Sequence, residues 1–455
     1  MDEKMKLLIC ILLMMVIVGP LEGAAWKKYP YNEPGSSITF PQDEGRHRGV
    51  ANLEWWYVVL HAKGQITGHE YSILVTHFNN TFRFFTITDL TDKTHESGTT
   101  RGKLKAHAKY MDVNQFTDYG HDYFRVKKDD RGALIPFEYE IETHHDSMYL
   151  KADFVALRPP MMVMKNGHFK IGKSGQTFYY SLTRLQARGV LTYHGITEPF
   201  EATAWMDHQW GPFFVSPIEV GKLFESYEWF SIQLDDGSDL MLINIYDRHF
   251  RLPKTLDYGA VEILDQNNMN KHTVDRIFKR KKYWQDPVSG HTMSMGWTLE
   301  VIDWDLSLNM EPDFYEQMVK MPLNGDFWEG SISVKGYHRG KYVEGRAFGE
   351  LIHRFQIPRI KMAPVKKNYH LNDMIKVKFQ IENPDEGNPL KFRVYAIDAN
   401  NQYLLKELNH IEEIHIRAGD LLGMFNTKAY QFKVEALSVD ESMVGARVTK
   451  SFKIK

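Results

Sequence analysis

Short runs of β-branched and aromatic residues, separated by turn signals, recur through this chain and restrict its fold more than any other feature. Residues 54–60 place apolar side chains on both faces of one such run. Asn79-Asn80 and residues 235–238 each separate two runs, which predicts hairpins because Asn, Asp and Gly tolerate positive φ. A helix is expected only at residues 311–318. The pattern predicts an all-β protein built from antiparallel barrels or sandwiches.

The length of 455 residues predicts several domains rather than one core. The strand pattern divides into an N-terminal domain of residues 26–215 and a second domain of residues 216–353. After a basic, proline-containing connector, residues 365–455 carry several further strand segments and no tryptophan. The spacing of these segments predicts an immunoglobulin-like sandwich. We interpret it as an accessory module that docks another protein or a component of the cell envelope.

The N-terminus has the pattern of a signal peptide. Lys4 and Lys6 precede an apolar run of residues 7–18, and small residues follow, so cleavage near residue 25 is expected. No later apolar run is long enough to span a bilayer. The single cysteine, Cys10, lies within the predicted signal, so the mature protein would have no disulfide. We therefore expect a secreted or periplasmic protein, or one of the cell envelope, that has no membrane span after cleavage.

Charge and motifs exclude several classes of function. The net charge of -2 offers no basic excess for binding nucleic acid. No phosphate-binding loop, dinucleotide fingerprint or nucleophile elbow is present, and we expect no cofactor. His144-His145-Asp146 is the one cluster typical of metal ligands, but adjacent ligands on a strand point apart. We therefore interpret it as a hairpin turn and expect no metal.

Residues 204–211 concentrate an acid, an imidazole and two indoles in one short run. In an extended strand, Trp205 and Asp207 would face one way, and His208 and Trp210 the other, unless Gly211 ends the alternation. A carboxyl group in aromatic surroundings can donate a proton near neutrality, an imidazole can activate water, and an indole face can stabilise a cation. The alternative, which the spacing alone favours, is a strand end with backbone-bonded polar groups and core tryptophans.

Trp55, Trp56 and Tyr57 also allow two interpretations. Aromatic residues on a strand fill a core by default. A barrel can instead hold one small ligand, with tyrosine and tryptophan orienting it. Both interpretations stay open on the sequence alone.

Several blocks together resemble the family of hydroxyneurosporene synthase (carotenoid 1,2-hydratase) and the AttH-like proteins, over residues 40–352. The resemblance implies two lipocalin-like β-barrels in tandem, with the Asp-His-x-Trp segment near their junction. The blocks are Phe40-Pro41 with Asp43 and Gly45, then residues 54–57, 179–184, 205–211, 229–230, 233–237, 328–330 and 345–351.

In the hydratases of this family, water adds to an isolated terminal double bond of an acyclic carotenoid without metal or nucleotide. The resemblance implies functional roles for His208 and Trp210, which match the family's His and Trp. The hydratases of the family also rely on a Tyr and an Asp further along the chain, and the nearest candidates for this pair here are Tyr246 and Asp247. The predicted catalytic residues are Asp207, His208 and Trp210. The predicted ligand-binding residues are Trp55, Trp56, Tyr57, Tyr180, Trp205 and Tyr246.

The leading hypothesis is cofactor-free acid–base hydration, or a related lyase or isomerase step, on an apolar isoprenoid-like or lipid-like molecule. A hollow shared by Asp207 and His208 would favour it. An apolar hollow beside a backbone-bonded Asp207 would favour a non-catalytic carrier of the cell envelope. A serine hydroxyl on an imidazole would favour a secreted hydrolase.

Overall fold

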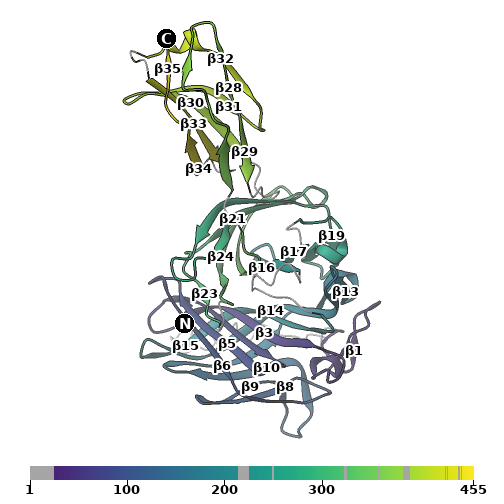
Figure 1. Ribbon diagram of the computed structural model, residues 1–455. Coiled ribbons are helices and arrows are strands. Elements are labelled where there is room, and N and C mark those ends of the chain that lie inside the picture. The colour runs from purple at the N-terminus through teal and green to yellow at the C-terminus, as the bar shows by residue number, and fades with distance from the viewer. Residues whose placement is uncertain are drawn as a thin grey trace, which may run out of the picture.

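The structure is a computed structural model that confirms the all-β class, with three parts following one another along the chain (Figure 1). The predicted signal peptide, including Cys10, lies outside the described residues except for Ala25, as does the boundary expected at residues 215–216. No helix in the described part of the chain has the length and apolarity to cross a membrane. The described residues are 25–213, 225–247, 251–321, 325–355, 358–382, 390–425, 427, 429–438, 441 and 443–455.

The first part is a 13-stranded antiparallel sheet that curls into a near-closed barrel. A two-stranded sheet, β1 (Tyr31–Asn32) and β2 (Thr39–Phe40), and the 3-10 helix η1 (Gln42–Glu44) precede it. Its first and last long strands pair with each other, as expected of a barrel. Its strands are β3 (Leu53–Gly64), β4 (Glu70–Phe78), β5 (Phe82–Asp89), β6 (Thr94–Arg101), β7 (Lys103–Ala106), β8 (Asp112–Thr117), β9 (Gly120–Lys128), β10 (Leu134–His145), β11 (Met148–Ala156), β12 (Met161–Met162), β13 (His168–Ile171), β14 (Gly175–Tyr193) and β15 (Ile196–Gly211), with η2 (Val163–Lys165) before β13.

The second part is a 10-stranded sheet in which the first and last long strands again pair, β16 with β25. Its strands are β16 (Ser226–Leu234), β17 (Asp239–Tyr246), β18 (Val261–Leu264), β19 (Asn270–Thr273), β20 (Ile277–Gln285), β21 (Thr292–Val301), β22 (Leu306–Pro312), β23 (Met318–Val319), β24 (Phe327–His338) and β25 (Lys341–Leu351), with η4 (Leu256–Tyr258) and η5 (Ile302–Trp304) between them. The helix expected at residues 311–318 is wrong, because Leu306–Pro312 pairs with β24 as a strand.

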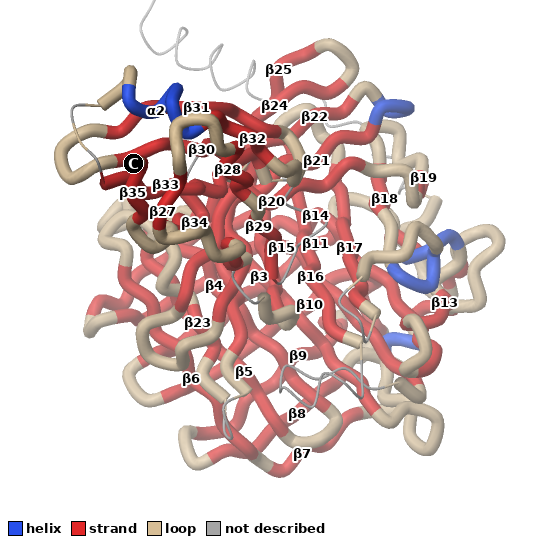
Figure 2. The backbone as a smooth tube through the Cα atoms, turned by 45° about the horizontal axis from the view of Figure 1, so that its top comes forward, coloured by secondary structure: helices blue, strands red, loops and turns tan. Residues whose placement is uncertain are grey.

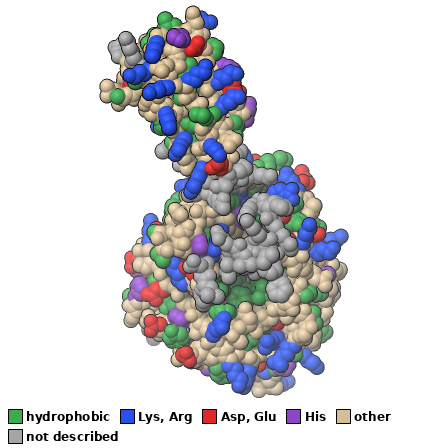
Figure 3. Space-filling view, in the orientation of Figure 1, with side chains coloured by type: hydrophobic (Ala, Val, Ile, Leu, Met, Phe, Trp, Pro, Cys, Tyr) green, Lys and Arg blue, Asp and Glu red, His purple; other side chains and the backbone are tan. Residues whose placement is uncertain are grey.

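The C-terminal part has its own core enclosed by small sheets (Figure 2). Lys and Arg side chains are spread over its visible face (Figure 3). Its elements are β26 (Arg359–Met362), β27 (Asn368–Tyr369), β28 (Met374–Val377), β29 (Phe379–Glu382), β30 (Lys391–Ile397), β31 (Gln402–Leu408), β32 (Ile414–Arg417), α2 (Ala418–Leu422), β33 (Ala429–Leu437), β34 (Met443–Val448) and β35 (Phe452–Ile454).

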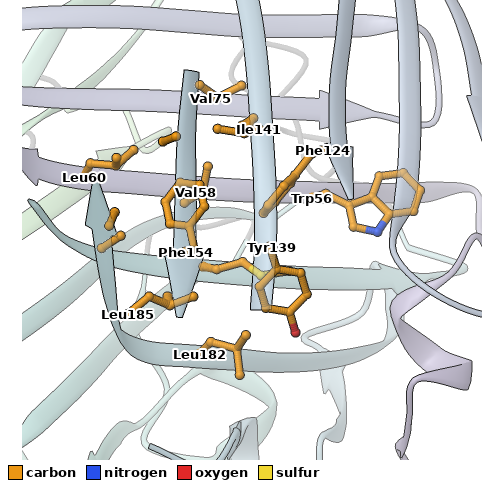
Figure 4. Close-up of a cluster of buried hydrophobic side chains, with 14 of the residues drawn as sticks. Trp56, Val58, Leu60, Val75, Phe124, Tyr139, Ile141, Phe154, Leu182 and Leu185 are labelled. Carbon is orange, nitrogen blue, oxygen red and sulfur yellow. The ribbon is translucent and has the colours of Figure 1, made fainter. Parts of the chain in front are cut away.

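Strand β3 and residues 204–211 of β15 are largely buried on both faces, which explains the apolar residues on both sides of residues 54–60. Trp56, Val58 and Leu60 point into the core of the first barrel (Figure 4). Tyr57 and Val59 point outward and pack against residues of β16, β17 and β25. A second apolar cluster therefore fills the junction between the barrels.

Buried charges fix the two barrels against each other. The Asp239 carboxylate on β17 lies 2.8 Å from Arg158 Nη1 and 2.6 Å from Arg184 Nη2, both of the first barrel. Thr183 Oγ1 donates to Asp239 at 2.8 Å. Because buried charges are tolerated when they are paired and hydrogen-bonded, this network favours one relative position of the barrels.

Candidate functional site

The alternation predicted for residues 204–211 holds. β15 continues through Gly211 between β14 and β3, with Asp207 opposite Ser181 and Tyr57. Asp207 lines the junction, whereas His208 faces the core of the first barrel. Asp207 and His208 therefore do not share one hollow, the arrangement that would have favoured hydration, because neighbouring residues on a strand face opposite ways.

The Asp207 carboxyl is buried and accepts hydrogen bonds from three side chains. Tyr179 OH donates to Oδ2 at 2.8 Å, while Ser181 Oγ and Trp205 Nε1 donate to Oδ1 at 2.5 and 2.7 Å. Burial raises the pKa of Asp207 to about 7, although the three donors oppose this rise. The group can therefore hold a proton at neutral pH, as the sequence hypothesis requires.

Two adjoining hollows lie at the junction. The first, which we call the acid hollow, has a volume of about 40 Å³ and is bordered by Asp207 and Glu350 among aromatic and aliphatic side chains. The second, the aromatic hollow, has a volume of about 160 Å³ and borders Phe78, Phe84 and Phe327. Their shared walls are Trp55, Tyr57, Tyr227 and Glu350. Since ligand pockets commonly have about 300–1,000 Å³, these hollows suit a small molecule or the end of a longer one.

The second barrel contributes a buried carboxyl group, that of Glu329, and a partly buried one, that of Glu350, to these walls. Glu329 on β24 and Glu350 on β25 are direct register partners, so their side chains lie on the same face. Tyr227 OH donates to Glu350 Oε1 at 2.6 Å. Burial raises the pKa of Glu350 to about 7, against the effect of the Tyr227 hydrogen bond. Burial and then the charge of Glu350 raise the pKa of Glu329.

Four polar atoms that border the hollows are buried without a hydrogen-bond partner among the described residues: Tyr57 OH, Thr76 Oγ1, Trp229 Nε1 and Glu329 Oε2. Buried polar groups are nearly always satisfied, and each exception costs about 1–3 kcal/mol. These four atoms can form hydrogen bonds with polar groups of a bound molecule, although similar atoms also occur away from the hollows.

The opposite face of β15 carries a histidine–glutamate network. His208 Nε2 lies 3.3 Å from Glu54 Oε1, and His47 Nδ1 lies 2.9 Å from the same oxygen. The His208 ring stacks on Trp56, and the His47 ring stacks on Trp210 at 4.0 Å. Burial alone would raise the pKa of Glu54, but hydrogen bonds from the two histidines hold it at about 2. The possible ligand atoms of His47, Glu54 and His208 lie within 4.8 Å of one another, so these three residues could hold a cation. That the protein binds no metal therefore stays a prediction.

The predicted site residues thus fall into three groups. Trp55, Tyr57 and Trp205 lie at the junction with Asp207. Three others, Trp56, Tyr180 and Trp210, lie with His208 in the core of the first barrel. Tyr246 lies elsewhere, where its hydroxyl donates to Glu228 at 2.6 Å and its ring stacks on His353.

Sequence reasoning missed Tyr179, Tyr227, Trp229, Glu329 and Glu350 as site residues. Four of the five belong to the blocks that carry the family resemblance, which is the one signal that could have found them. Tyr227 lies two residues before the 229–230 block. Their convergence depends on strand register and on the packing of one barrel against the other, which a linear pattern does not contain.

The fold and site define a tandem β-barrel protein of lipocalin type with carboxyl groups in a hollow between the barrels. The sequence profile of the AttH-like family matches residues 31–353, and the chain belongs to this family. No curated protein sequence matches the chain significantly.

Two crystal structures share the fold. A protein from Nitrosomonas europaea, described as a candidate AttH, has a TM-score of 0.57 at 19% identity, covering 71% of this chain and 98% of its own. Kievitone hydratase from Nectria haematococca has a TM-score of 0.55 at 15% identity, covering 72% of this chain and 98% of its own. These identities show the likeness of the fold alone.

Proposed function

We propose that this protein adds water to a carbon–carbon double bond of an isoprenoid-like or lipid-like molecule, by cofactor-free acid–base chemistry at the barrel junction. The observation that carries the proposal is Asp207, a buried carboxyl with a pKa of about 7 at the wall of the acid hollow. Protonation of an alkene needs an acid that is still protonated at working pH and is shielded from bulk water.

The aromatic walls supply the second requirement. Protonation of an alkene leaves a carbocation, which an aromatic π face stabilises. Trp55 and Tyr57 border both hollows, and Trp229 packs edge-on to Tyr57 with ring centroids 5.5 Å apart. The name of the structural neighbour, kievitone hydratase, supports hydration as the reaction class.

Polar contacts favour an enzyme over a carrier. A passive apolar carrier would have an aliphatic pocket with Asp207 bonded to backbone. Instead, Asp207 is held by three side-chain donors, and Glu350 borders the same hollow. The unsatisfied polar atoms indicate a substrate with a hydroxyl or similar group near its double bond.

The experiment is isotope incorporation. We expect the wild-type protein, incubated in H₂¹⁸O with kievitone or an acyclic carotenoid, to form a labelled alcohol that mass spectrometry detects. Asp207→Asn should lose this activity while it still binds cis-parinaric acid, a fluorescent apolar probe. Asp130→Asn, on an exposed turn, is the matched control. Undiminished label uptake by Asp207→Asn would remove Asp207 from the mechanism.

A hydrolase is the second candidate, because Ser226 Oγ lies 2.6 Å from His353 Nδ1. A serine on an imidazole can serve as a nucleophile. However, neither residue borders the junction hollows, and Thr88 Oγ1 makes a similar contact with His95 Nδ1 at 2.8 Å. Labelling by a fluorophosphonate that Ser226→Ala abolishes would favour hydrolysis over hydration.

We also propose that the protein is exported. The proposal rests on the signal pattern of residues 1–25, which lie almost wholly outside the described part of the chain. N-terminal sequencing of the protein isolated from its native host should begin near Trp26. A mature protein that begins at Met1 would contradict export by cleavage.

A further inference from the structure

We propose that Glu329 and Glu350 act together as the base that activates water in this hydration, with Glu350 facing the acid Asp207 across the acid hollow and Glu329 beside it at the aromatic hollow. This inference rests on the proposed function and deepens it. No residue of the predicted catalytic set can take this role at the junction, because the ring of His208 lies on the other face of β15.

The geometry comes from two rows of side chains on facing sheets. Trp229, Glu350 and Glu329 lie side by side across β16, β25 and β24, as the strand registers show. The opposite row runs through Asp207 and Tyr57 on β15 and β3. Asp207 and Glu350 border one hollow of about 40 Å³. This volume can hold a water molecule, which needs roughly 10–15 Å³ and two or more polar partners.

The second carboxyl group completes the site. Register partners on antiparallel strands have Cβ atoms about 4.5–5.5 Å apart, so Glu329 and Glu350 cannot both ionise without strong repulsion in a buried place. The pair therefore retains one proton above neutral pH and loses the other near pH 7, where the pKa of Glu350 lies. Tyr227 donates to Glu350, whereas Glu329 Oε2 has no partner among the described residues. Glu350 borders the acid hollow, and the Tyr227 hydrogen bond favours its ionised form, so Glu350 is the member that accepts a proton from water while Glu329 holds the shared proton.

The chemical step balances. The Asp207 carboxyl gives its proton to one carbon of the double bond, and the π electrons form that C–H bond. The oxygen of water bonds to the cationic carbon, and the ionised member of the glutamate pair takes a proton from this water. The product is the alcohol, Asp207 is left ionised, and the pair is left doubly protonated. Transfer of one proton from the pair to Asp207 restores the starting state.

The titratable groups that face the pair are Asp207, Tyr57, Tyr179 and Tyr227. With an acid and a base that both titrate near neutrality, kcat/KM should follow a bell-shaped pH profile. Glu350→Gln should remove the limb that rises with pH, because it removes the base. The limb that falls with pH reports the loss of the Asp207 proton.

The test compares Glu329→Gln, Glu350→Gln and Glu350→Asp with the control Glu344→Gln, all in the full-length chain. Glu344 is exposed on the same strand as Glu350. Uptake of ¹⁸O from labelled water into kievitone or an acyclic carotenoid gives kcat. Infrared spectroscopy near neutral pH measures the carbonyl band of protonated carboxyl groups without any substrate. Circular dichroism checks that each variant is folded.

We expect each glutamine variant to lose about 100-fold or more in kcat and to change the infrared band, as expected for loss of a general base. Glu350→Asp should recover part of the rate, and Glu344→Gln should match the wild type. Wild-type rates in both glutamine variants would overturn the glutamate base and leave the proposed hydration standing. An infrared band unchanged in both variants would also overturn it. If the wild-type protein itself incorporates no label, the proposed function fails, and this inference fails with it.

Discussion

Replacement of Asp207 by Asn gives a pH-dependent change in stability whose size follows from the structure. Burial raises the pKa of this carboxyl from 3.8 to about 7 in the folded protein. A shift of roughly 3 units corresponds to about 4 kcal/mol, since each pKa unit is worth about 1.4 kcal/mol. Asparagine has the same shape, still accepts through one oxygen, and cannot ionise.

The sign follows from proton binding. Between about pH 4 and pH 7, the folded protein holds the Asp207 proton and the unfolded chain has released it, so folding stability falls as pH rises through this window. Above about pH 7 the full cost of a buried carboxylate is present. Asp207→Asn should therefore gain stability relative to the wild type by about 4 kcal/mol between about pH 4 and pH 9. Carboxyl groups that do not interact with Asp207 cancel in this difference, whereas Glu350 does not, because the charge of Asp207 raises its pKa.

Urea unfolding followed by tryptophan fluorescence measures the effect. All ten tryptophans lie before residue 329, so the signal reports on the barrels and not on the C-terminal part. A difference between variant and wild type that does not change with pH would refute the reasoning. It would mean that Asp207 ionises in the folded state as it does in the unfolded chain, and that it is no acid at neutral pH.

Three further predictions concern single side chains. His208→Ala should lower the free energy of unfolding by about 2–4 kcal/mol, because it empties core volume and removes a partner of Glu54. It should leave label uptake at the wild-type rate; loss of uptake in a stably folded His208→Ala would return His208 to the catalytic set. Tyr57→Phe should raise the unfolding free energy by about 1 kcal/mol, since it removes a buried hydroxyl that has no partner among the described residues. The same change should slow label uptake. A loss of stability in Tyr57→Phe would show that the hydroxyl is hydrogen-bonded. Asp239→Ala should cost about 3–5 kcal/mol by leaving the buried Arg158 and the half-buried Arg184 without their carboxylate. An unchanged urea midpoint would contradict that view of the junction.

The fold class could be predicted from the sequence because the strand and turn patterns that determine it are local. The hairpins at Asn79-Asn80 and residues 235–238 are confirmed, and each uses a residue at positive φ, Thr81 in the first and Gly237 in the second. The helix expected at residues 311–318 is wrong because pairing with β24 overrides local propensity.

The site was only partly predictable for a related reason. Alternation correctly separated Asp207 from His208, but the sequence could not decide whether Gly211 ended that alternation. It also could not show that Glu350 comes opposite Asp207 with Glu329 beside it, because this depends on register and on how the barrels pack. Burial of an acid on a face shared by two barrels is a tertiary property, and so is its raised pKa.

The most direct test of the account is label uptake from H₂¹⁸O by the wild type and by Asp207→Asn, with His208→Ala beside them. The two changed residues are neighbours on β15 but face opposite sides. The account predicts a labelled alcohol from the wild type and from His208→Ala, and none from Asp207→Asn. Loss of uptake in His208→Ala with full uptake in Asp207→Asn would place the chemistry inside the first barrel and contradict a reaction at the junction.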